Sequence, residues 1–365
     1  MQLDFFPSRT LTLYLAKLFA VRIAAMLFVL VLVLMMLDLL SSSGEILAVP
    51  GNGQGELLTY AGLRIPQLIS RFLPYSVLLA TLITLVTLNQ NSEVIAMKAA
   101  GLSAHQVLAP LLLTAGIVSL VTFGFNERVV TRATATLKAW EAVDFGPIPT
   151  DSRVRTNIYL TDNGNILTAA YLAGTGDAIA MRKVTWYQRN AEGMIVEQVQ
   201  ADTARYASPG WQLEGITRFS VQNAVTERPA TMVVGEGLTP DQIDLAKIDP
   251  DTEPFWTLTS SIAEFERAGR RTSELRAKWW HKISGPLSAF LMPLLGAVAA
   301  FGLARSGQLF VRAVIGMALG FAYFVIDNAA LAMGSFGGYP PSLAAWAPFF
   351  LFLLIGETVL IRTEE

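Results

Sequence analysis

The chain has 365 residues, of which 53% are hydrophobic and only 15% are charged, a balance that excludes an ordinary soluble protein and favours a polytopic membrane protein. A formal net charge of -2 without a basic stripe excludes a nucleic-acid-binding protein. The absence of cysteine excludes disulfides and thiolate sites, and the two histidines, His105 and His281, lack the carboxylate spacing that a metal centre needs.

Three apolar segments in the first third of the chain each approach the roughly 20 residues that a helix needs to cross a bilayer. They cover residues 11–40, 72–88 and 107–125. The first segment begins too far into the chain and lacks a small-residue cleavage site, so we interpret it as a retained helix and not a signal peptide. A helical lead-in to the second segment is expected to break or kink near Pro66 and Pro74.

A short segment between the second and third apolar segments, residues 91–103 (NSEVIAMKAAGLS), has the pattern of a surface helix. It offers an apolar ridge, a charge pair at the edge of the ridge and a glycine C-cap. These features are carried by Val94, Met97 and Leu102, by Glu93 and Lys98, and by Gly101. The helix either rests on lipid headgroups or inserts into a groove of a cytoplasmic motor subunit as a coupling helix.

The middle of the chain, residues 128–274, is polar and alternates in the manner of β-strands. The expected strands are residues 157–161, 166–172, 180–189, 195–206 and 211–222, with turn signals between them. Short, closely spaced antiparallel strands predict a sandwich or jelly roll. A connector rich in Gly, Pro and Asp (235–254) and an amphipathic helix (258–276) then return the chain to the membrane.

Three further apolar segments close the chain, at residues 283–304, 313–333 and 343–361. The predicted fold class is therefore an α+β membrane protein, with six transmembrane helices in a three-plus-three arrangement and an inserted antiparallel β-jelly-roll. The expected domains are residues 1–127, which hold three spans and a coupling helix at about 92–101, residues 128–274, which hold the β domain and connector, and residues 275–365, which hold the last three spans.

Lysine and arginine in the short flanks of the spans predict the orientation. They gather on one side, at Arg9, Lys17, Arg22, Lys98, Arg305, Arg312 and Arg362. The opposing short loops, residues 41–56 and 334–341, contain neither residue type. We assign the basic side to the cytoplasm, so the β domain is expected outside, in the periplasm of a Gram-negative cell.

Motifs of common enzymes are missing from the sequence. It has no G-x-x-x-x-G-K-[ST] phosphate loop, no H-E-x-x-H and no G-x-S-x-G. An intramembrane protease needs paired catalytic residues at depth, whereas the acidic residues of the spans, Asp38, Asp327 and Glu357, each lie near a span end. We therefore expect a transport or binding role and no catalytic residues.

Four long segments carry a resemblance to a known family. They are FLPYSVLLATLITLVTLNQNSEVIAMKAAGLS (72–103), LTPDQIDLAKIDPD (238–251), KWWHKISGPLSAFLMPLLG (278–296) and RSGQLFVRAVIGMALGFAYFVIDNAA (305–330). On these segments the chain resembles the permease family of the lipopolysaccharide exporter, and it is more similar to the LptG-type than to the LptF-type members. The LptF-type subunit and a non-transport membrane anchor with an extracytoplasmic β binding domain are the alternatives.

The resemblance implies an ABC transporter of the inner membrane that extracts lipopolysaccharide and passes it through β-jelly-rolls toward the outer membrane. The implied partners are a second, LptF-like permease, a cytoplasmic LptB-like ATPase dimer and an LptC/LptA-like periplasmic bridge. Cofactors bound by this chain are not implied, because the ATPase uses the ATP and Mg.

The resemblance also assigns roles to residues. It places the coupling helix on Glu93, Val94, Met97, Lys98 and Gly101, with the acidic Glu93 facing the ATPase. Spans one and five line the gate, and their candidate residues are Leu34, Leu37, Gly316, Gly320, Phe321 and Phe324. The G-x-x-x-G step of span five either packs within the subunit or forms a seam against span one of the partner permease.

An anionic glycolipid calls for a cavity with a basic outer rim. The candidate rim residues lie at the outer ends of spans two, three and four, namely Arg64, Arg71, Arg128, Arg132, Arg276, Lys278 and Lys282. Arg64 and Arg71 are seven residues apart and are expected on one helix face. The competing interpretation is that such residues reach to lipid headgroups as ordinary anchors.

Overall fold

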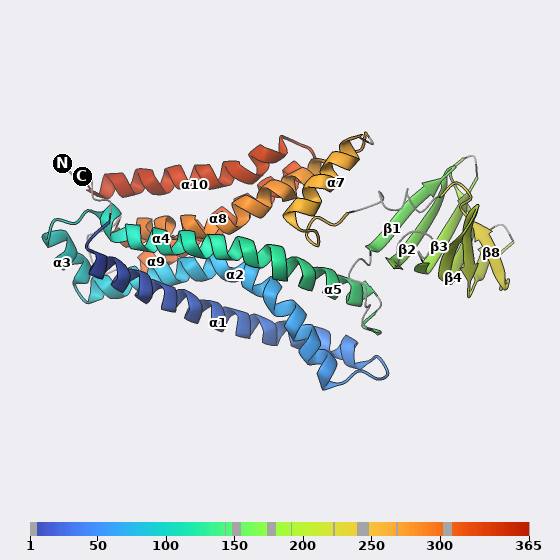
Figure 1. Cartoon of the computed structure of the whole chain (residues 1–365), viewed down its shortest axis with the longest axis horizontal. Helices are drawn as coiled ribbons and strands as arrows, with labels where there is room; N and C mark the ends of the chain where they lie inside the picture. Colours follow the sequence, from blue (N-terminus) through green and yellow to red (C-terminus); the bar gives the residue numbers. More distant parts are fainter. Residues whose placement is uncertain are drawn as a thin grey trace. The chain divides into compact units, whose positions relative to one another are not determined.

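The computed structural model describes residues 6–142, 144–147, 155–173, 180–190, 192–221, 223–238, 248–267, 269–301 and 309–364. The chain divides into two compact units. The helical unit comprises Met1–Leu39, Arg64–Val130 and Pro254–Glu365, and the β unit comprises Leu40–Leu63 and Thr131–Glu253. Figure 1 shows the long helices of the first unit and the sheet of the second, and each unit is described by itself.

Long helices precede and follow the sheet. In chain order they are α1 (Arg9–Leu47), α2 (Gln54–Gln90), α3 (Glu93–Ala99), α4 (Ala104–Phe125), the π-helical turn η1 (Asn126–Val130), α5 (Thr131–Ala142), α7 (Phe255–Arg267), α8 (Ser273–Phe301), α9 (Leu309–Ser335) and α10 (Pro341–Glu364). A break in the second span is absent, because α2 runs continuously through Pro66 and Pro74. A kink at these prolines, the other form of the prediction, stays a prediction. Leu73 and Val77 of α2 are buried in the helical core, so neighbouring helices support α2 near its prolines, as they do in other membrane spans.

Among the described residues, five helical stretches are long and apolar enough to cross a membrane. They are Arg9–Leu47, Gln54–Gln90, Ala104–Glu141, Val314–Ser335 and Pro341–Arg362. The predicted fourth span, 283–304, falls on α8 and extends beyond its described end. The number of six spans therefore stays a prediction.

Helix α8 packs against α4, α9 and α10. Its buried side chains include Leu291, Met292 and Leu295, which join a single apolar core with residues of α1, α2, α4, α9 and α10. Such a central, apolar position is typical of a helix enclosed within a bundle. The core thus holds the helical unit together around α8.

The amphipathic stretch expected at 258–276 is two helices, α7 and α8. Gly269 adopts a left-handed φ of 68°, its N–H donates to the Glu266 carbonyl (3.0 Å) and the Arg270 N–H donates to the Phe265 carbonyl (2.9 Å). These two bonds form the glycine-based C-cap known as the Schellman motif. The cap ends α7 and turns the chain into α8, which corrects the prediction of one helix.

The β unit carries one antiparallel sheet of eight strands in its described part. The strands are β1 (Arg155–Asp162), β2 (Asn165–Ala173), β3 (Ala180–Arg189), β4 (Ile195–Ala207), β5 (Gly210–Glu214), β6 (Thr217–Ser220), β7 (Val225–Glu227) and β8 (Thr231–Val234). Their order is β1-β2-β3-β4-β5-β8, with β6 paired to β4 and β7. The first four predicted strands are confirmed, and an inserted antiparallel sheet is present.

The fifth predicted strand, 211–222, is divided into β5 and β6. The long strand β4 pairs with β5 through Thr203–Ala207 and with β6 through Glu197–Gln200, so the chain turns between two sections of the same partner. Strands β7 and β8 have no counterpart in the prediction, because they are only three and four residues long. Alternation cannot be recognised over so few residues.

One face of the sheet forms the apolar core of the β unit. It includes Leu167, Val184, Val199 and Trp211, all nearly or fully buried, and the Trp211 indole N–H donates to the Leu238 carbonyl (2.9 Å). Among the polar residues, the carboxylate of Glu197 on β4 is held by the guanidinium of Arg218 on β6. This hydrogen-bonded contact raises the pKa of Arg218.

Candidate functional site

The short helix α3 ends as the sequence predicts. Gly101 has a φ of 88°, its N–H donates to the Lys98 carbonyl (3.0 Å), and the Leu102 N–H donates to the Met97 carbonyl (3.1 Å). This is again the Schellman motif, which favours glycine because a Cβ is strained at positive φ. The next helix starts at once, with Ser103 and Gln106 forming a capping box.

The apolar ridge of α3 faces into the molecule. Val94 and Met97 are buried in the helical core, with Leu102 packed beside them. The surface that α3 leaves open contains Ile95, which is 62% exposed, and Lys98. The seven-residue helix covers the end of its own bundle with the ridge and leaves its opposite side open.

Glu93 connects α3 to α1. Its Oε2 accepts a hydrogen bond from the Tyr14 hydroxyl of α1 (3.1 Å), and its Oε1 accepts one from the Asn91 amide (3.3 Å). The Glu93 side chain is thus already engaged within the chain, on the first turn of the predicted coupling helix. A displacement of α3 would act directly on α1.

Both histidines have carboxylate neighbours, contrary to the prediction from their spacing. His105 Nε2 of α4 lies 3.3 Å from Glu357 Oε2 of α10, and His281 Nε2 of α8 lies 3.0 Å from Asp327 Oδ2 of α9. Each partner is contributed by a different helix, which spacing along one segment cannot reveal. The described residues contain no group of three or more His, Cys, Asp or Glu that could hold a metal ion.

Carboxylate partners are seen for the predicted rim residues Arg64, Arg276 and Lys282. Arg64 pairs with Asp38 at 3.0 Å, Arg276 with Glu266 at 2.5 Å and Lys282 with Glu127 at 3.7 Å. Arg64 also donates to Gln67 (2.9 Å). The other four lie at the surface, with Arg71, Arg128 and Arg132 exposed and Lys278 half-buried. Arg71 and Arg128 both belong to the helical unit, and their role as rim residues stays a prediction.

The G-x-x-x-G step of α9 packs within the subunit. Gly316 and Gly320 are buried, and a Cβ at Gly320 would collide with the Leu78 side chain of α2. Phe324 is buried too, and its ring stacks on Tyr75 of α2 at a centroid distance of 3.8 Å. The small residues therefore serve the close approach of α9 to α2.

The remaining gate candidates lie on open surfaces. Phe321 of α9 is 64% exposed and Leu37 of α1 is 59% exposed, while Leu34 is half-buried. Of the five apolar stretches, α1 is the least buried. An apolar surface of this length requires lipid or another protein to cover it.

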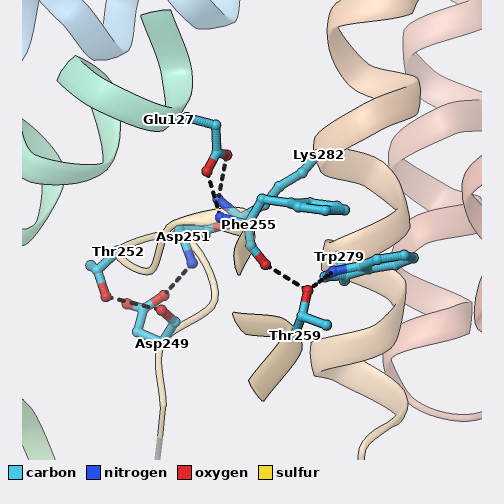
Figure 2. A network of polar contacts seen from close by, with 8 residues as sticks. All are labelled: Glu127, Asp249, Asp251, Thr252, Phe255, Thr259, Trp279 and Lys282. Atoms are coloured by element: carbon cyan, nitrogen blue, oxygen red, sulfur yellow. Dashed lines mark hydrogen bonds and ion pairs between the residues drawn. The ribbon is translucent and has the colours of Figure 1, made fainter. Parts of the chain in front are cut away.

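A carboxylate that the sequence pattern does not single out lies at η1. Figure 2 shows Glu127 directed toward the start of α7 and toward α8, where its Oε2 accepts the Phe255 backbone N–H (2.5 Å) and its Oε1 lies 3.7 Å from Lys282 Nζ. Both charged side chains are largely buried, at 13% and 15% exposure. The signal for it in the sequence is weak, since NERVV reads as an ordinary helix end.

Comparisons with known proteins agree with a chain of apolar helices that is interrupted by an inserted antiparallel sheet. Residues 13–362 match the family model described as "Lipopolysaccharide export system permease LptF/LptG". The lipopolysaccharide export system permease protein LptG of Escherichia coli K12 is 25% identical over 310 residues, which cover 83% of this chain and 84% of that protein. The LptG protein of Haemophilus influenzae Rd is 23% identical over 316 residues, which cover 85% and 87%.

Proposed function

Because the chain belongs to the lipopolysaccharide export system permease family, LptF/LptG, we propose that it is the permease subunit that moves lipopolysaccharide out of the inner membrane. It is a multi-pass membrane protein and a transport subunit. Of the two subunit types that the family name covers, LptG is the one proposed, since the curated relatives carry that name.

The observation that carries the proposal is the open apolar surface of α1 and α9, at Leu37 and Phe321. A lipid with several acyl chains needs an apolar path with a protein wall on each side. One subunit supplies one wall, so the proposed second wall is another permease of the same family. Phosphates of the lipid would meet Arg71 and Arg128, because guanidinium groups match phosphate oxygens in pairs.

The energy is proposed to come from a separate ATPase in the cytoplasm, which uses ATP and Mg. The sequence has no phosphate loop of its own. The ATPase would dock on the open side of α3, around Ile95 and Lys98, and its movement would reach α1 through the Tyr14–Glu93 hydrogen bond. Since α1 carries much of the open surface, this contact links the motor to the lipid path.

The sheet is proposed to form a jelly roll in the periplasm that receives the lipid. Its face is lined with apolar side chains around Val199 and Trp211, which are buried against one another in the β unit, so receiving acyl chains would require this core to open. The same β unit would pass the lipid to a periplasmic bridge of similar domains. A sixth span on α8 is also proposed, and it would put both ends of the chain in the cytoplasm and the sheet outside.

Photocrosslinking tests the proposal. The chain is reconstituted in proteoliposomes with the second permease, the ATPase and lipopolysaccharide, with a photoreactive amino acid at Leu37 or Phe321. Crosslinks to lipopolysaccharide are expected at both positions and should change with ATP. Leu354 of α10, 65% exposed and outside the proposed path, is the matched control. Equal, ATP-independent crosslinks at Leu354 would show mere contact with bulk lipid and contradict the proposal.

A further inference from the structure

The chain passes between the helical unit and the β unit at four places, two of which flank the sheet in the sequence. It leaves through α4, η1 and α5, and it returns through residues 248–254 into α7 and α8. Glu127 belongs to the outgoing connection, whereas Phe255 and Lys282 belong to the returning one. A single carboxylate therefore joins the two connections within the helical unit.

We propose that Glu127 is a positioning residue that ties the returning connection to the outgoing one, and that transfer of lipid from the spans to the sheet depends on this tie. The inference rests on the proposed function for the lipid, but the tie itself is a property of the fold. Glu127 supports two groups at once, the first N–H of α7 and the ammonium of Lys282.

The contact with Phe255 caps a helix. The first N–H groups of a helix have no partner within it, and α7 begins at Phe255. A carboxylate at a helix start satisfies one of these donors and also faces the positive end of the helix dipole. Here the cap comes from another helix, so capping α7 also fixes its place against η1.

Aromatic rings pack on Phe255, which helps to keep the neighbouring charged side chains largely buried. Phe255 stacks on Trp279 of α8 at a centroid distance of 4.7 Å and meets Phe123 of α4 edge to face at 6.1 Å. Thr259 donates to the Phe255 carbonyl (2.8 Å) and accepts from the Trp279 indole (2.8 Å), as Figure 2 shows. In such a setting, removing one charge leaves the other buried and unpaired, which costs more than the pair contributes.

Two further observations support a role beyond packing. The tie lies at a π-helical turn, and such turns are frequent at functional sites. The same two connections are tied again within the β unit, where Lys138 Nζ of α5 lies 2.5 Å from Asp249 Oδ2 of the returning segment. That second pair is more exposed, at 38% for each side chain, so Glu127 is the stronger tie.

Hydrogen exchange of the purified complex in nanodiscs tests the tie. In Glu127→Ala the amides at the start of α7 are expected to exchange about tenfold faster, the factor that corresponds to the loss of a helix cap. Lys282→Met should act in the same direction, and Lys282→Arg should restore slow exchange. Glu127→Gln keeps an acceptor oxygen, so its exchange rate at the start of α7 should lie between those of Glu127→Ala and the unsubstituted chain. Glu274→Gln, an exposed carboxylate at the start of α8, is the control and should match the unsubstituted chain.

Transfer is measured in the same variants by photocrosslinking of lipopolysaccharide at Phe321 and at Met232, which lies beside the apolar core of the sheet. Glu127→Ala and Lys282→Met are expected to keep the crosslink at Phe321 and to lose most of the crosslink at Met232. If hydrogen exchange at the start of α7 is unchanged in these variants, Glu127 does not hold α7 in place. If exchange is faster but the crosslink at Met232 is normal, the contact of Glu127 exists but plays no part in lipid transfer. If the unsubstituted complex gives no ATP-dependent crosslink, the proposed function is contradicted instead. Hydrogen exchange, measured without lipopolysaccharide or ATP, then decides by itself whether Glu127 joins the two connections.

Discussion

Arg64 of α2 forms a two-pronged ion pair with Asp38 of α1, with Nη2 3.0 Å from Oδ1 and Nε 3.2 Å from Oδ2. In this geometry the guanidinium is held both by the attraction of opposite charges and by two directional hydrogen bonds. The pair fastens the C-terminal half of α1 to α2, and it occupies an arginine that the sequence pattern assigns to lipid phosphate.

Asp38→Asn is expected to destabilise the contact between α1 and α2. The two side chains are 20% and 31% exposed, so we expect a loss of about 1 to 2 kcal/mol, between the values for surface and buried pairs. The contribution of the pair is measured by thermal unfolding of three variants of the complex, namely Asp38→Asn, Arg64→Gln and the double substitution. Strictly additive effects of the two single changes would mean that the pair contributes nothing.

Tyr14→Phe removes one hydroxyl and the hydrogen bond from α1 to Glu93. The ATPase should still copurify, because the open side of α3 is unchanged, while ATP-driven release of lipopolysaccharide should fall about fivefold, as expected for a contact worth about 1 kcal/mol. Release is measured from proteoliposomes. Tyr75→Phe, in the middle of α2, is the control, because it removes a tyrosine hydroxyl that does not contact Glu93. Undiminished release in Tyr14→Phe would remove this hydrogen bond from the mechanism.

Substitutions at Ile95 and Met97 distinguish docking of the ATPase on α3 from the contribution of α3 to stability. Ile95→Glu should abolish copurification of the ATPase and leave thermal stability within about 0.5 kcal/mol, because this side chain is exposed. Met97→Ala should cost about 2 kcal/mol of stability, because Met97 is buried in the core. If Met97→Ala, once folded, loses the ATPase while Ile95→Glu keeps it, the ridge and not the open side is the docking surface.

Gly320→Val tests the approach of α9 to α2. A side chain at this position collides with Leu78, so the substitution should destabilise the helical unit by about 1 to 3 kcal/mol. Gly124→Ala of α4 is the matched control, since a Cβ at that position meets no atom within 4 Å. It should be neutral or slightly stabilising. Equal stability of Gly320→Val and the unsubstituted protein would contradict the packing of these helices.

The sequence predicted the features that depend on local pattern. Strands β1 to β4 followed from alternation over five or more residues, and the C-cap at Gly101 followed from one glycine after an amphipathic turn. The separation of α7 from α8 at Gly269 was not predicted, because the apolar spacing continues from one helix into the other. The partners of His281, Arg64 and Lys282 were missed because each lies on another helix, and no single segment contains that information.

The open side of α1 has a consequence for how the cell makes this protein. If the proposed partner permease covers the apolar surface of α1, a newly inserted copy without that partner exposes this surface to aggregation and to membrane proteases. Balanced synthesis of the subunits is then a structural requirement, and expression of this chain alone should give a low yield that recovers when its neighbours are produced alongside it.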